Sequence, residues 1–198
     1  YVDRLKLTGR EGIEDLADYL KENGILEAPA SGGNHCHHSG GLLEHSLNVY
    51  NTAVRLAHEI LPTEEYDKMI ESIVICSLLH DIGKIGDYGK EMYVKNMIKD
   101  GKPTKASPEQ KYKQSESKPF KRNPDLTGVP HAIRSIKLAT LFIDLTEEEE
   151  WAILTHDGLY DFMKYEIPGR ETKLSMIIHF ADLWSSKVLE DEKTVEEE

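Results

Sequence analysis

The sequence has few cysteines, no long hydrophobic run and a deficit of positive charge. Its two cysteines, Cys36 and Cys76, form no spaced motif, so we expect no disulfide framework and a reducing, cytoplasmic environment. No apolar run approaches the roughly 20 residues of a membrane span, and no signal peptide opens the chain, which argues against a membrane partner. The net charge of −12 argues against a general nucleic-acid coat protein.

The remaining composition is that of an ordinary globular protein. The 198 residues are 39% hydrophobic and 30% charged, which is enough apolar material for a real core. Apolar residues recur at helical spacing nearly everywhere, and this periodicity predicts an all-α protein with one domain over residues 1–198. The predicted helices cover about residues 41–61, 63–83, 130–143, 147–156 and 173–189. The acidic tail at residues 190–198 is expected to be frayed and solvated.

Local signals refine these helices. Thr63 precedes two glutamates and is expected to be an N-cap, while Thr146 begins a capping box. Pro130 suits the first helical position. In the last helix, Trp184 and Val188 continue the stripe of apolar residues that is expected to face the core.

Residues 86–130 interrupt the helical pattern and carry an unusual charge. They contain ten Lys or Arg against six Asp or Glu, a net charge of +4, so the remainder of the chain carries −16. A basic segment in an acidic protein can steer an anion. An irregular insertion of this length is often functional, for example as a lid, and its short aromatic pieces predict a small β-hairpin. A solvated or disordered lysine-rich loop is the alternative.

Six positions stand out because their side chains are typical metal ligands: His45, His80, Asp81, His131, His156 and Asp182. Imidazole nitrogens together with carboxylate oxygens suit borderline divalent metals. Each of the six lies in or at the end of an apolar helical segment, where an uncompensated polar group is costly. A metal or a tight hydrogen-bond network usually meets that cost. The set therefore predicts a metal-dependent enzyme.

Each of these residues, taken singly, also fits a structural role. His45 lies on an apolar stripe, as core histidines do, and His131 at a helix start is typical of a cap or a stacked ring. His156 near a helix C-terminus is suited to compensating the helix dipole, and Asp182 to an internal salt bridge. A structural explanation for all six together is far less plausible.

The motifs around these residues resemble the HD-domain superfamily of metal-dependent phosphohydrolases. The resemblance rests on the segments GGLLEHS, LLHDIGK and FADLWSS, and it extends over about residues 34–189. The segments PHAIRS and THDG are similar to the two additional histidine segments of that superfamily's two-metal branch. The resemblance implies an HD-domain helical bundle, here with a long irregular insertion at residues 86–130.

The resemblance also implies how the ligands are divided. A first divalent metal would be held by His45, His80, Asp81 and Asp182. Asp81 would bridge to a second metal, which His131 and His156 complete. The metal could be Mn, Fe, Co, Ni or Zn, and both one and two metals per chain remain open. Two metals about 3.5–4 Å apart can activate a water and clamp the attacking and leaving oxygens of a phosphate ester.

Three further residues are candidates for contacts with a phosphate or a leaving group. Lys84 lies one turn past Asp81 and would supply a cationic contact, whereas Arg134 would bind phosphate oxygens with its two-pronged guanidinium. Asp87 is a candidate general acid or base. The alternatives are a surface lysine near a helix end for Lys84 and a surface ion-pair residue for Arg134.

Other polar residues lie close to the ligands in sequence. His35, His37 and His38 are expected to form a polar loop that lines the pocket, with an accessory metal site as the alternative. Asp157 is expected to orient the histidine before it. His179 is expected to be structural.

The expected function is hydrolysis of a phosphomonoester or phosphodiester of a nucleotide or short oligonucleotide. Similar HD regions occur in bacterial exoribonucleases that carry extra nucleic-acid-binding domains, which are absent from this sequence. The chain looks more like stand-alone HD hydrolases of bacteria and phages. The expected partner is a small phosphorylated substrate, with short single-stranded nucleic acid as a further option. The alternatives are an HD-fold di-iron oxygenase with the same ligand types and a non-catalytic module that binds a nucleotide.

Overall fold

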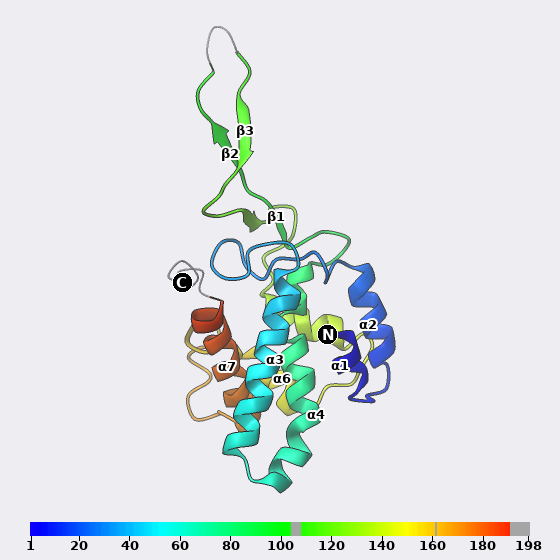
Figure 1. Cartoon of the computed structure of the whole chain (residues 1–198). Helices are drawn as coiled ribbons and strands as arrows, with labels where there is room; N and C mark the ends of the chain where they lie inside the picture. The colour runs from blue at the N-terminus through cyan, green and yellow to red at the C-terminus, as the bar shows by residue number, and fades with distance from the viewer. Residues whose placement is uncertain (104–107, 161, 191–198) are drawn as a thin grey trace.

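A computed structural model describes residues 1–103, 108–160 and 162–190. The centre of the molecule consists of three long helices: α3 (Gly41–Ile60), α4 (Thr63–Leu79) and α7 (Lys173–Trp184). The helix α3 packs against both of the others (Figure 1). None of the helices in the described parts of the chain combines the length and the hydrophobicity of a membrane span.

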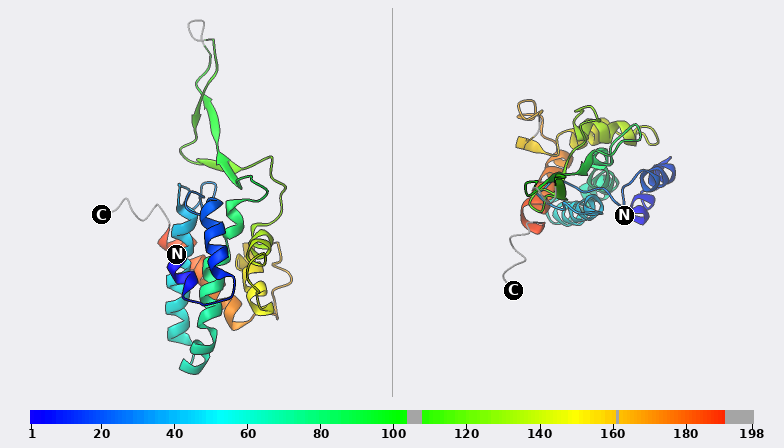
Figure 2. Two further views of the ribbon diagram at one scale, coloured as in Figure 1. Left: turned by 90° about the vertical axis from the view of Figure 1, so that its right-hand side faces the viewer. Right: turned by 90° about the horizontal axis from the view of Figure 1, so that it is seen from above.

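Shorter helices flank the central three on different sides of α4 (Figure 2). On one side lie α1 (Val2–Lys6) and α2 (Ile13–Glu22), of which α1 contacts α4. On the other lie α5 (His131–Ala139) and α6 (Glu147–Leu154), and α6 packs on both α4 and α7. The predicted all-α bundle is confirmed.

The helix α4 is apolar on two faces because it is buried from two directions. Ile75, Leu78 and Leu79 belong to a core cluster shared with α1 and α2. Ile73 and Cys76 belong to a second cluster shared with α6 and α7. Each fully buried large aliphatic side chain contributes about 1.5–3 kcal/mol to folding. The apolar run IVICSLL is therefore a central helix.

The helix starts agree with the predictions in one case of three. Thr146 caps α6 in a full capping box with Glu149. The predictions for the other two are wrong by one residue, because Pro62 is the N-cap of α4 and Pro130 that of α5. Both prolines have extended backbones, with ψ of 145° and 140°, which leaves Thr63 as the first helical residue of α4.

Two helices end earlier than their sequence patterns suggest. The helix α4 stops at Leu79, and a separate 3₁₀ turn, η1 (Ile82–Ile85), follows. The helix α7 passes into a π-helical segment, η3 (Ser185–Leu189). The prediction that Trp184 and Val188 face the core is wrong, because both line a shallow groove on the surface, and Trp184 is 54% exposed.

The insertion forms the predicted β-hairpin, built as two small antiparallel sheets in succession. The inner sheet pairs β1 (Tyr93–Lys95) with β4 (Phe120–Arg122), and the outer sheet pairs β2 (Met97–Asp100) with β3 (Lys111–Gln114). Residues 92–123 are called the arm below. Figures 1 and 2 show the outer sheet extending away from the helical bundle.

Candidate metal centre

The structure brings all six predicted metal ligands together, although they come from five helices. They are placed by α3 (His45), the end of α4 (His80 and Asp81), α5 (His131), the end of α6 (His156) and α7 (Asp182). Five of the six side chains are almost fully buried, and only His131 is more than 12% exposed.

A close approach between η1 and α5 sets the position of His131. The backbone N–H of Gly83 donates to the hydroxyl of Ser135 at 2.8 Å. A Cβ atom at Gly83 would lie 2.2 Å from the carbonyl oxygen of His131, so any larger residue would push α5 away. The glycine of the segment LLHDIGK therefore allows the first residue of α5 to reach Asp81.

One half of the cluster surrounds His45. Its Nε2 lies 3.1 Å from Oδ1 of Asp182 and 3.4 Å from Oδ2 of Asp81. Nε2 of His80 lies 3.3 Å from the same nitrogen of His45 and 3.5 Å from Oδ2 of Asp81. Donors that surround one ion at bonds of about 2.1 Å are about 3.0–3.4 Å apart in octahedral or tetrahedral arrangements. The four spacings of 3.1–3.5 Å are close to these values, and Nε2 of His80 lies farther, 3.9 Å, from Oδ1 of Asp182.

The other half surrounds His131. Its Nε2 lies 3.1 Å from Nε2 of His156 and 3.2 Å from Oδ1 of Asp81. Nε2 of His156 lies 3.5 Å from the same oxygen. Asp157 also belongs here, with Oδ2 at 3.3 Å from His131. Asp157 was expected to orient His156 from behind the ring. Its carboxylate instead lies next to Nε2 of both His131 and His156, on the side of the rings that faces the centre of the cluster.

The rings are held so that their Nε2 atoms face the centre. Nδ1 of His80 lies 2.9 Å from the carbonyl oxygen of Ser77, and Nδ1 of His156 lies 2.7 Å from that of Ile153. A carbonyl only accepts, so both Nδ1 atoms carry a proton, and Nε2 of each ring is the atom left to bind a metal or a second proton. Backbone contacts of this kind fix the tautomer of metal-binding histidines.

Glu190 orients the third ring and was missed by the sequence analysis. Its carboxylate lies 2.9 Å from Nδ1 of His45 and accepts a bond of 3.0 Å from Asn48. The prediction of a solvated tail is wrong at this residue, which is 8% exposed, while residues 191–198 lie outside the described part of the chain. Helical periodicity could not have found Glu190, because the π segment η3 changes the spacing of side chains after α7.

The electrostatics of the cluster favour positive charge at His45 and His156, whereas burial lowers the pKa of His80. Burial alone lowers the pKa of His45, but its contacts with Asp182 and Glu190 outweigh burial and raise the pKa to about 9. Burial likewise opposes protonation of His156, yet Asp157 and Asp81 raise its pKa to about 10. The carboxylates that stabilise a proton on these rings would also stabilise a metal cation in its place.

The donor set fits divalent metal ions. Nε2 atoms of four histidines meet one another and the carboxylates of Asp81, Asp182 and Asp157, an arrangement that places positive charge, either metal ions or protons on the rings, between them. Oδ1 of Asp81 is buried and makes no hydrogen bond of good geometry with any described residue. Nitrogen and oxygen donors in this ratio suit Mn, Fe, Co, Ni or Zn.

The three residues predicted to contact the phosphate lie in different surroundings. Nζ of Lys84 lies 2.6 Å from Oδ2 of Asp81 at the edge of the cluster. Burial disfavours the charge on Lys84, but Asp81 outweighs burial and raises its pKa. Arg134 is buried and donates to the carbonyl of Thr127, and Asp87 pairs with Lys137 and with Arg134.

The remaining histidines occupy both the cavity and the surface. The ring of His35 packs on that of His45, with centroids 4.8 Å apart, whereas His38 is exposed beside Glu44. His37 is half-buried in the same loop. His179 bonds to the carbonyl of His156 at 2.7 Å, which agrees with the structural role expected for it.

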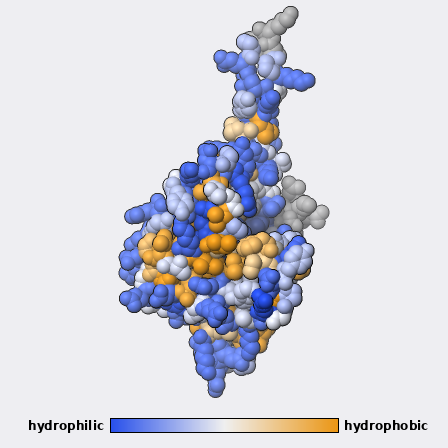
Figure 3. All heavy atoms as spheres, turned by 180° about the vertical axis from the view of Figure 1, so that it is seen from behind, coloured by the Kyte–Doolittle hydropathy of each residue, from blue (hydrophilic) through white to orange (hydrophobic). Residues whose placement is uncertain are grey.

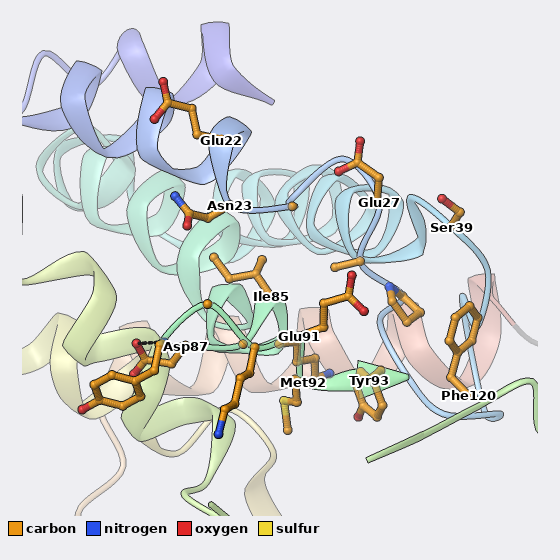
Figure 4. A pocket seen from close by; sticks show the side chains of 18 of the residues that line it. Glu22, Asn23, Glu27, Ser39, Ile85, Asp87, Glu91, Met92, Tyr93 and Phe120 are labelled. Carbon is orange, nitrogen blue, oxygen red and sulfur yellow. Dashed lines mark hydrogen bonds between the residues drawn. The ribbon is translucent and has the colours of Figure 1, made fainter. Parts of the chain in front are cut away.

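Two cavities meet at Lys84. The smaller has a volume of about 210 Å³ and reaches the cluster, with a lining that includes His35, Asp81 and Asp157. The larger, of about 710 Å³, lies between α2, the turn after η1 and the base of the arm (Figure 4). Figure 4 shows Tyr93 and Phe120 of the inner sheet on its wall. Residues at the base of the arm therefore form part of the wall of the larger cavity.

Comparison with known proteins identifies one family. The family model of the HD domain matches residues 42–185, which include all six predicted ligands. Neither a curated protein nor a solved structure matches the chain.

Proposed function

Because the chain belongs to the HD-domain family of metal-dependent hydrolases, we propose that it hydrolyses a phosphomonoester or phosphodiester of a nucleotide or short oligonucleotide. One observation carries the proposal. The two carboxylate oxygens of Asp81 face different sets of histidine nitrogens within one buried cluster. A carboxylate between two nitrogen-rich sites is suited to bridging two divalent ions.

In this proposal residues 1–198 act as one HD domain with two metal ions. The first ion is held by His45, His80, Asp81 and Asp182. The second is held by Asp81, His131 and His156, and the position of Asp157 supports adding its carboxylate to this set. When bound, such ions supply an activated water and stabilise the charge on the phosphoryl oxygens.

The chain's own residues bind and orient the substrate. An ammonium group has three N–H donors. Lys84 uses one donor on Asp81, and the cavities on both sides of it leave room for a phosphate oxygen to accept from another. We therefore propose Lys84 as the residue that positions the phosphate.

The contacts of Arg134 and Asp87 favour an indirect role for both. Arg134 is enclosed and already donates to Thr127, while the carboxylate of Asp87 is neutralised by Lys137. We propose that they hold the turn after η1 against α5, instead of touching the phosphate as the sequence suggests. The turn in question forms one wall of the larger cavity.

The sizes of the two cavities support a nucleotide substrate. A volume of about 210 Å³ suits a phosphate group beside the ligands, and about 710 Å³ lies in the range that encloses a small organic ligand. The aromatic rings of Tyr93 and Phe120 in the larger cavity can pack against a nucleobase.

The test is phosphate release by the metal-loaded protein. Wild-type chain and Asp81→Asn are incubated with nucleotide and phosphodiester panels in Mn²⁺, Fe²⁺, Co²⁺ and Ni²⁺, and metal content is measured by elemental analysis. We expect two ions per chain and turnover that Asp81→Asn abolishes. Absence of turnover with every metal would refute the proposal, and oxygen uptake by the iron-loaded protein would support the oxygenase alternative.

A further inference from the structure

The outer sheet of the arm contributes nothing to the hydrophobic core. Every residue of β2 is exposed, and in β3 only Gln114 is half-buried. Met97, Ile98 and Tyr112 remain exposed on it. Two strands without a third or a packed helix are only marginally stable in water. A role in binding explains such a sheet better than a role in folding.

The charge of the arm is opposite to that of the rest of the protein. Residues 92–123 contain nine Lys or Arg against three Asp or Glu, a net charge of +6, so the rest of the chain carries −18. Within the described residues only one of the arm's cations, Lys113, forms an ion pair, with Glu116. Figure 3 shows the described part of the arm as largely hydrophilic, with a small hydrophobic patch nearer the bundle. Such unpaired charge attracts a polyanion.

The strand register places aromatic rings and cations on the same faces. Residues opposite one another in an antiparallel pair point to the same side. In the outer sheet Lys99 is opposite Tyr112. In the inner sheet Lys95 is opposite Phe120, and Arg122 is opposite Tyr93. Each pair therefore combines a surface for stacking with a charge for a phosphate.

These pairs lie in the outer and the inner sheet, and the pairs of the inner sheet are next to the cavities at the metal centre. Tyr93, Lys95 and Phe120 line the larger cavity, and Lys84 lines both this cavity and the smaller one. The base of the arm is fixed to the bundle, because Phe120 donates its backbone N–H to Gly32 at 3.1 Å. The base of the arm thus lies beside a cavity that shares Lys84 with the cavity at the cluster.

We infer that the arm binds single-stranded nucleic acid and guides it toward the metal centre. Stacking on aromatic rings combined with lysine contacts to phosphates is the general means of holding single strands. A cavity of about 210 Å³ at the cluster has no room for a duplex. The inference rests on the proposed function only for what happens to the strand at the centre, because binding by the arm needs no hydrolysis.

Binding is measured with fluorescent, phosphorothioate-linked 15-mers and the full-length, metal-loaded chain, so that affinity is read independently of cleavage. The charge variant is Lys95→Gln with Lys99→Gln, the two exposed lysines opposite Phe120 and Tyr112, and its control is Lys21→Gln with Lys68→Gln on exposed helix surfaces. Two lost phosphate contacts should lower the magnitude of the salt slope by about 1.4. If the two proteins bind equally at about 1 M salt, the variant should therefore bind about 25-fold more weakly than the wild type at about 0.1 M. The control should retain the wild-type slope.

Stacking is tested separately at Tyr112. Tyr112→Leu removes the aromatic face and should weaken binding about 5- to 150-fold, whereas Tyr112→Phe should bind like the wild type. Both variants should keep the wild-type melting temperature, since Tyr112 is 57% exposed.

Three outcomes would overturn the inference. One is equal affinity of the wild type and the Lys95/Lys99 variant for the oligonucleotide. Another is tighter binding to duplex than to single strands without dependence on Tyr112. The third is binding to anionic phosphatidylserine vesicles but not to oligonucleotides. A protein that binds strands through the arm yet hydrolyses no nucleotide or phosphodiester substrate with any metal would refute the proposed function alone.

Discussion

Asp81 illustrates how a single residue can organise the centre. It follows the C-cap of α4, and its backbone, with φ of −110° and ψ of 3°, leaves the helical path. This sparsely occupied region of φ and ψ is common at active sites. Burial opposes the charge of the carboxylate, but Lys84 and the surrounding histidines outweigh burial and hold the pKa of Asp81 well below its usual value. Asp81 is therefore an anion ready for metal.

Glu190 is the best residue for a test of ring orientation. We expect Glu190→Gln to lower metal affinity about 10- to 100-fold, because a carboxylate behind a ligating histidine fixes the ring and raises its basicity. Affinity is measured by competition with a chromophoric chelator, which requires no turnover.

Glu64→Gln, an exposed acid in the first turn of α4, is the matched control for charge. It should bind metal like the wild type. If Glu190→Gln and Glu64→Gln have the same affinity as the wild type, the contact between Glu190 and His45 has no role in metal binding.

At the scale of elements, the contact between η1 and α5 connects the two halves of the centre. We expect Gly83→Ala to lose the second metal, because the added methyl group collides with the backbone of His131. The same collision should lower the free energy of unfolding by about 1–3 kcal/mol. Gly128→Ala is the control, since a Cβ there meets nothing within 4 Å. Metal content and urea unfolding are measured for both; two metals in Gly83→Ala would contradict the packing argument.

A second element-scale prediction concerns the cap of α6. Glu149 joins this cap to Arg10 through two bonds of 2.9 Å and to Ser72 at 2.7 Å. Burial opposes the charge of Glu149, but Arg10, Thr146 and Ser72 outweigh burial and lower its pKa. Since the folded-state pKa is depressed, the stabilisation is present above the unfolded value near 4.3 and is lost as pH falls through the folded value.

Glu149→Gln should therefore lower the free energy of unfolding by about 3 kcal/mol at pH 7. The difference from the wild type should shrink as the pH falls below about 4, and urea titrations across that range measure it. A difference that stays constant with pH would mean that shape, and not charge, explains the effect.

The sequence predicted the helices better than the contacts between them. Apolar periodicity and the Thr146 capping box are local signals, so α3 and α6 were located closely. The ligand histidines could be found because their spacing resembles a known family. Glu190 could not, since its partner His45 is 145 residues away and a π segment intervenes. The short aromatic pieces indicated the inner strands of the arm, but the outer sheet depends on pairing across residues 97–114, which no local pattern specifies.

At the scale of the whole molecule, the metal centre connects helices from distant parts of the chain. Five helices or helix ends supply its ligands, so a bound metal ion would hold these elements together. A metal that binds only the folded state therefore stabilises the entire bundle, not one element. Saturation at 100 times the dissociation constant adds about 2.7 kcal/mol.

Removal of metal should thus lower the melting temperature by about 5–10 °C, given about 2–4 °C per kcal/mol for a chain of this size. The measurement is calorimetry of the full chain after chelation and after Mn²⁺ is restored. Restoration should recover the loss in the wild type but not in Asp81→Asn, which lacks the carboxylate shared by both halves. An unchanged melting temperature with every divalent metal would mean that the folded protein binds no metal at this cluster. In that case hydrogen bonds of protonated histidines would hold the cluster together.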